Sequence, residues 1–150
     1  MSQLSALAKP FPDQLVKTKP GSFAAQYVEH GQVVAKLLAT VGAYSFRVVE
    51  LIRDADSTVS GVLAELAVTI DGRDIVIVEV GDYDGPDNAS AGRRAQVATS
   101  NALRRCAMRC GCGLNLWTSD GQYRLYTALQ LAEQTANKTP FIAEPGDLDQ

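Results

Sequence analysis

The sequence predicts an α+β fold with an α-β-β-β-α core, in which helices pack on one face of an antiparallel three-stranded meander and an extra helix follows. Three observations predict it. An apolar stripe with helical spacing precedes Gly42, and apolar residues then alternate with polar ones through much of residues 44–80. A second helical pattern begins at about residue 91. Because only short turns separate the three predicted strands, neighbouring strands must be antiparallel.

Length and composition bound the possible functions. A chain of 150 residues with 46% hydrophobic residues suits one domain with a sizeable core. No apolar run approaches the roughly 18 residues that span a bilayer, and the N-terminus lacks a secretory pattern, so we expect a cytoplasmic protein without a membrane partner. The net charge of −3 argues against a general polyanion binder. Any contact with nucleic acid must therefore be a local patch.

Residues 1–26 are predicted to be an irregular basic N-terminal arm, because they carry three prolines and three lysines but only one acid. The core is expected to span residues 27–117. Its first helix should end at Gly42, a typical helix-ending residue. The apolar face of this helix repeats at helical spacing: Val33, Val34, Leu37, Leu38 and Val41.

The strands of the meander are predicted at residues 44–53, 62–70 and 75–80, with a turn at 54–58. The Asp71-Gly72 pair is the strongest hairpin signal in the chain. A loop at 81–90 leads to the second core helix, for which Ser90 or Asn88 is a plausible N-cap. The C-terminal helix is expected within residues 118–138, and residues 139–150 are expected to be a disordered acidic tail.

The second core helix, residues 91–111, is strongly basic. It carries five arginines, and no Asp or Glu occurs from Asn88 through Ser119. At 100° per residue, Arg94, Arg105 and Arg109 share one side. Arg93 and Arg104 form a neighbouring stripe, and small residues fill the opposite side. The helix therefore has a face to bury and a basic face, which could be simply solvated or could bind phosphates.

Other candidate sites carry less chemistry. The cysteine spacing, C-x3-C-x-C, differs from the usual zinc patterns and indicates small buried hydrophobic residues, so no metal is expected. Four carboxylates near a strand end could serve a metal-dependent nuclease if they converged: Glu79, Asp82, Asp84 and Asp87. The chain has no Walker A motif and no G-x-G-x-x-G motif, so we expect no cofactor, no ATP-driven chemistry and no catalytic residue.

Arginines without compensating acids suit phosphate contacts, and they also stack on bases of single strands. The α-β-β-β-α order occurs in double-stranded RNA-binding domains too, so topology alone does not choose the ligand.

Four segments in order resemble the Rad fifty-two type of single-strand annealing protein. They are PFPDQLVKTKPG at residues 10–21, QYVEHGQVVAKLLATVGAYSF at 26–46, the meander followed by VGDYDG, and RRAQVATSNALRRCAMRCGCGLNLW at 93–117. The last is the most specific. The chain departs from the family pattern in having Gln32 in place of a basic residue, Phe46 in place of tryptophan, and Cys110 in place of an aromatic residue.

The resemblance implies ATP-independent binding and annealing of single-stranded DNA in recombination and repair, by a homo-oligomeric ring or arc with a positive groove. It places Arg104 and Arg105 on the paired basic residues that grip the DNA backbone, and Arg93 near another basic position. Arg109 is offset by one residue and could instead serve a subunit interface. The full predicted DNA-binding set is Arg104, Arg105, Arg93, Arg94, Arg109, Lys17, Lys19 and Lys36.

The expected partners are single-stranded DNA, further copies of the chain and a single-strand DNA-binding protein. If the chain is phage-encoded, it would act in the cytoplasm of a bacterial host. Two alternatives stay open: a small metal-dependent nuclease and a monomeric double-stranded RNA-binding module.

Overall fold

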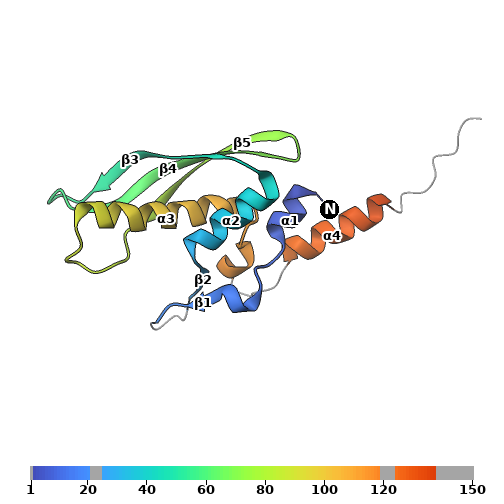
Figure 1. Cartoon of the computed structure of the whole chain (residues 1–150), viewed down its shortest axis with the longest axis horizontal. Helices are drawn as coiled ribbons and strands as arrows, with labels where there is room; N and C mark the ends of the chain where they lie inside the picture. The colour runs from blue at the N-terminus through green and yellow to red at the C-terminus, as the bar shows by residue number, and fades with distance from the viewer. Residues whose placement is uncertain (1, 21–24, 119–123, 138–150) are drawn as a thin grey trace, which may run out of the picture.

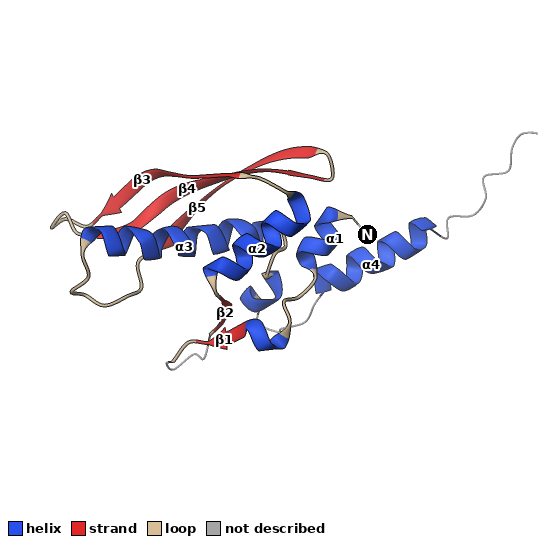
Figure 2. Cartoon of the chain, viewed as in Figure 1, coloured by secondary structure: helices blue, strands red, loops and turns tan. Residues whose placement is uncertain are grey.

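The computed structural model, which describes residues 2–20, 25–118 and 124–137, is an α+β fold with helices on one face of a three-stranded sheet (Figure 1). The antiparallel order β3-β4-β5 confirms the predicted meander. Its strands are β3 at Ser45–Arg53, β4 at Val59–Ile70 and β5 at Arg73–Asp82. Figure 2 shows the sheet as one layer above the helices.

Two helices complete the predicted core. α3 (Ala91–Arg109) lies along β4 and β5, and α2 (His30–Val41) packs against α3. Gly42 ends α2 with φ 77°, and Ser90 caps α3 by accepting a hydrogen bond from the amide of Arg93. The additional C-terminal helix is α4 (Arg124–Asn137), which packs against the N-terminal segment rather than the sheet.

The central strand, β4, follows the predicted period of two. Val62, Ala64 and Leu66 are completely buried on the face that meets α3, whereas the alternating residues point to the opposite face. The β4–β5 hairpin turns at Asp71 and Gly72, which both have positive φ. That conformation is characteristic of a two-residue type I′ turn, as the sequence predicts.

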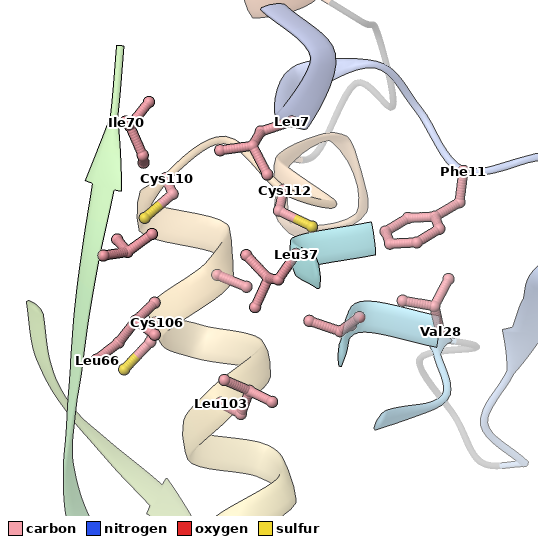
Figure 3. Close-up of a cluster of buried hydrophobic side chains, with 13 residues drawn as sticks. Leu7, Phe11, Val28, Leu37, Leu66, Ile70, Leu103, Cys106, Cys110 and Cys112 are labelled. Carbon is pink, nitrogen blue, oxygen red and sulfur yellow. The ribbon is translucent and has the colours of Figure 1, made fainter. Parts of the chain in front are cut away.

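The core lies between the sheet, α3 and α2 (Figure 3). Cys106 of α3 and Cys110, the residue after α3, point toward β4, and Cys112 lies beside Leu37 of α2. All three thiols are free and buried, and burial raises each pKa to about 11. The cysteines are therefore neutral small hydrophobic residues, as their spacing indicates.

The prediction of an irregular arm at residues 1–26 is wrong. The segment contains the helix α1 (Gln3–Ala8), a 3-10 turn at Asp13–Leu15, and the strand β1 (Val16–Thr18), which pairs with β2 (Gln26–Val28). Leu7 and Phe11 belong to the main core cluster. The N-terminal segment is thus part of the globular body.

Contacts with distant residues stabilise α1. Asp71, at the tip of the β4–β5 hairpin, accepts hydrogen bonds from the amides of Gln3 and Leu4 at 2.8 and 3.2 Å. The Gln3 side chain accepts one in return from the Asp71 amide at 2.7 Å. Glu133 of α4 accepts from the Ser5 hydroxyl at 2.6 Å. The local side-chain cap of this six-residue helix is Ser2, which accepts a hydrogen bond from the Ser5 amide. The other partners named here lie far away in sequence and leave no local pattern.

The predicted disordered tail, residues 139–150, lies outside the described residues. Among the helices that are described, none combines the length and the apolar character that crossing a membrane would require.

Candidate nucleic-acid interface

A cavity of about 350 Å³ lies between the β1–β2 hairpin, α3 and the 3-10 turn Leu114–Trp117. Three cationic side chains line it, from Lys19 of the hairpin and from Arg104 and Arg105 of α3. The aromatic rings of Tyr27 and Trp117 line it as well. Cations beside aromatic faces are the combination that single-stranded nucleic acid needs, because phosphates require charge and bases require stacking surfaces. We refer to this cavity as the Arg-aromatic pocket.

Arg104 is held on the hairpin side of the pocket. Its guanidinium donates to the backbone carbonyl of Val28 at 3.4 Å and to the side-chain oxygen of Asn101. It also lies 5.9 Å from the centre of the Tyr27 ring. Burial lowers the pKa of Arg104 from its usual value, but arginine remains charged at neutral pH. The Arg104 guanidinium therefore places one positive charge, in a fixed orientation, between α3 and the β1–β2 hairpin.

Arg105 and Arg109 share one acceptor, Glu79 of β5. Arg105 donates to one carboxylate oxygen at 3.3 Å, and Arg109, one helical turn later, donates to the other. The Glu79 side chain is only 10% exposed, whereas those of Arg105 and Arg109 are 40% and 57% exposed. Arg105 also lies 5.3 Å from the Trp117 ring centre. The carboxylate thus orients both guanidiniums while leaving much of each accessible.

Replacing Glu79 by glutamine is expected to weaken the fold at neutral pH and, if the Arg-aromatic pocket binds single-stranded DNA, to strengthen that binding. The carboxylate would compete with phosphate for two arginines, so its removal should then raise DNA affinity several-fold. Losing its charged hydrogen bonds should cost about 1–2 kcal/mol of unfolding free energy. Strand binding by fluorescence anisotropy and urea denaturation measure the two effects. Weaker DNA binding by a folded variant would contradict the expectation.

The difference in unfolding free energy between wild type and Glu79→Gln should also depend on pH. Hydrogen bonding, first from Arg109, lowers the pKa of Glu79 below its usual 4.5. A lowered folded-state pKa stabilises the fold above the unfolded value, and that contribution disappears as the pH falls through the folded value. The gap between wild type and Glu79→Gln should therefore shrink on acidification. Glu50→Gln, on the exposed part of β3, is the control for the loss of one carboxylate.

A polar network closes the remaining side of the pocket. Lys19 forms an ion pair with Asp84, and the Asn101 amide donates to the other Asp84 oxygen at 3.2 Å. Asn101 also donates to the backbone carbonyl of Asp82 at 2.7 Å. These bonds join the β1–β2 hairpin and the loop after β5 to α3. The cavity walls thus come from segments far apart in the sequence.

The other predicted cations lie elsewhere. Arg94 donates to the carbonyls of Val59, Asp87 and Ala89, and it lies 4.5 Å from the Tyr83 ring centre, so its guanidinium secures the loop before α3. Arg93 is exposed on the first turn of α3. Its position, 11 residues before Arg104, is roughly 16 Å along the helix axis.

Two predicted lysines are also engaged away from the pocket. Lys17 pairs with Glu29, the N-cap of α2, and does not line the pocket. Lys36 lies 4.5 Å from the Phe11 ring centre and donates to the carbonyl of Lys9. Of the eight predicted cations, Lys19, Arg104 and Arg105 line the pocket, and Arg109 is linked to it through Glu79.

The nuclease alternative needs carboxylates that converge. Glu79 is bound by Arg105 and Arg109, and Asp84 is bound by Lys19 and Asn101. Within the described part of the chain, no group of three or more His, Cys, Asp or Glu side chains is arranged to hold a metal ion. These carboxylates instead position the basic side chains.

The sequence did not predict that the aromatic side chains of Tyr27 and Trp117 line the pocket. Tyr27 and Trp117 are 90 residues apart, and only the packing of the hairpin and the 3-10 turn onto α3 brings both to the same cavity. The available local signal was that each aromatic residue lies within a segment, 26–46 or 93–117, on which the predicted resemblance rests.

Comparisons of this chain with protein-family models, with curated proteins and with solved structures find no match.

Proposed function

We propose that this protein binds single-stranded DNA and anneals complementary strands without ATP, as a homo-oligomer of the Rad fifty-two type. The observation that carries the proposal is the Arg-aromatic pocket, where Arg104 and Arg105 each lie beside an aromatic ring. Guanidinium groups bind phosphate through directed hydrogen bonds and stack on flat rings, so they suit a flexible strand better than isolated ammonium groups do.

Annealing follows from how such a site would hold a strand. Contacts to phosphate position the backbone without reading its sequence. Most bases then remain free to test a second strand, and base pairing supplies the free energy. We place this activity in the cytoplasm, in recombination and repair, beside a single-strand DNA-binding protein.

Assembly would increase the affinity of the site. One subunit offers a few cations on a chain with net charge −3, whereas linked copies bind one strand with far higher avidity. Two features favour self-association. The outer face of β5 exposes Val76, Val78 and Val80. In addition, β3 and β5 are edge strands of the three-stranded sheet, and such edges are often covered or extended by a neighbouring chain.

The decisive experiment mixes the protein with two complementary fluorescently labelled oligonucleotides, without ATP and without divalent metal. We expect the strands to anneal faster with the protein than without it. We also expect the mass of the protein in solution to correspond to several subunits. Affinity should fall steeply with salt, with a log–log slope of roughly −2 for each subunit that contacts three phosphates. Annealing no faster than the spontaneous rate would refute the proposal.

Two further arms address the alternatives. Magnesium or manganese is added to labelled strands, and the products are separated by size; cleavage would favour the nuclease. Double-stranded RNA is offered in competition with single-stranded DNA to a sample of measured mass. Preference for the RNA duplex by a monomer would favour the RNA-binding module.

A further inference from the structure

We propose that the Arg-aromatic pocket accepts one nucleobase of the bound strand, which leaves the base stack and inserts between Tyr27 and Trp117. This inference rests on the proposed function, because it concerns how the same site holds single-stranded DNA. The base would occupy the interior of the cavity, and the phosphates would stay at its rim.

The walls of the pocket have the chemistry of a base-binding site. Trp117 borders the cavity and is 48% exposed, so part of this residue is accessible to a ligand. Behind the rings, the lining is apolar, with Val28, Val33 and Cys112 each less than 5% exposed. Cavities that bind small planar ligands are mostly apolar, with a few polar groups that fix orientation. Stacking on aromatic side chains is also tolerant of base identity.

The charges that line the cavity largely offset one another, which suits a polar but uncharged group. Asp82 and Asp84 line the same space as Lys19, Arg104 and Arg105. The two carboxylates offset two of these three cations, which weakens the attraction of the interior for a phosphate. The amino groups of a base can donate to the carboxylate oxygens. The phosphates on either side of the inserted base would remain near the exposed parts of Arg105 and Arg109.

The cavity is large enough to hold one base. Its volume of about 350 Å³ is near the lower end of the range for small-molecule sites, roughly 300–1,000 Å³. An oligomer would therefore withdraw one base per subunit from pairing and leave the intervening bases exposed. Between two inserted bases, the remaining bases would form a short unpaired group, and the spacing of the subunits would set its length.

The test compares two strands with the same number of phosphates, one with bases throughout and one made entirely of abasic nucleotides. Trp117 is the single tryptophan of the chain, so its fluorescence reports directly on this pocket. The intact strand should quench Trp117 emission and bind at least about tenfold more tightly than the abasic strand. Equal affinity and equal emission for the two strands would overturn the inference while leaving the proposed function intact. Binding of neither strand would overturn both.

Variants separate stacking from charge. Trp117→Ala, measured with a labelled strand, should bind the intact strand about as weakly as the abasic one, with the abasic affinity unchanged. Trp117→Phe retains an aromatic face and should recover most of the difference. Because the side chain is 48% exposed, neither change should unfold the protein, and thermal denaturation checks this. A Trp117→Ala variant that still prefers the intact strand as strongly as wild type would contradict insertion of a base.

Discussion

Replacing Arg104 and Arg105 together by alanine is expected to lower the affinity for single-stranded DNA by a factor of about 100 to 20,000, and to abolish annealing. Hydrogen bonds to charged groups contribute about 1.5–3 kcal/mol each, so the loss of one such contact per arginine gives this range. Both side chains line the same cavity, so the two losses should affect one binding event.

The two arginines differ in what else they stabilise. Arg104 bonds to the Val28 carbonyl and to Asn101, so its removal also loosens the hairpin. Arg105 bonds only to the carboxylate of Glu79 among the described residues, and 40% of its side chain is exposed. Arg105→Ala alone should therefore weaken DNA binding with a smaller change in stability. A folding defect in the double variant would appear first in Arg104→Ala.

The matched control is Arg73→Ala, which removes an exposed arginine at the start of β5, beside the hairpin tip. Arg73→Ala removes one positive charge, as each substitution of the double variant does. It should change the affinity for single-stranded DNA by no more than about twofold, because exposed charges more than about 10 Å apart are largely screened. Anisotropy with a labelled strand gives the affinities, and circular dichroism checks the fold. If the double variant anneals at the wild-type rate, these arginines are not the DNA contacts.

The parts of the fold that the sequence predicted are those with local or strictly periodic signals. The meander follows from alternation along β4 and from a turn that needs positive φ at Asp71 and Gly72. The end of α2 follows from Gly42. The N-terminal helix was missed because several of its stabilising contacts are distant, such as those with Asp71, a residue 68 positions after Gln3. Short helices of this kind depend on tertiary contacts more than on their own sequence.

The candidate site was predicted less completely, for a similar reason. A helical wheel gives the direction in which each arginine leaves the helix axis, but it does not show which residues of other elements that arginine contacts. Arg94 and Arg105 share a side of α3, yet Arg94 meets carbonyls of the preceding loop, whereas Arg105 meets Glu79 and Trp117. Only the packed structure separates an arginine that secures a loop from one that borders a cavity.

The second large effect is expected from Gly81→Ala, near the end of β5. A Cβ atom at Gly81 would lie 2.1 Å from the carbonyl oxygen of Ala98 and 2.4 Å from the amide nitrogen of Ala102. Both atoms belong to the backbone of α3, so no side-chain rotation can relieve the contact. The helix must move away from the sheet, and the buried contacts of Ala98 and Ala102 with β4 would loosen. We expect a loss of about 3 kcal/mol or more of unfolding free energy.

Gly92→Ala provides the control, because a Cβ at this position in the first turn of α3 would meet no atom within 4 Å. Alanine favours helix over glycine, so this variant should be as stable as wild type or up to about 1 kcal/mol more stable. Urea denaturation midpoints compare the three proteins. Because α3 carries Arg104 and Arg105, displacement of the helix by Gly81→Ala should also weaken strand binding where the variant remains folded. A Gly81→Ala midpoint equal to that of wild type would show that α3 does not approach β5 this closely.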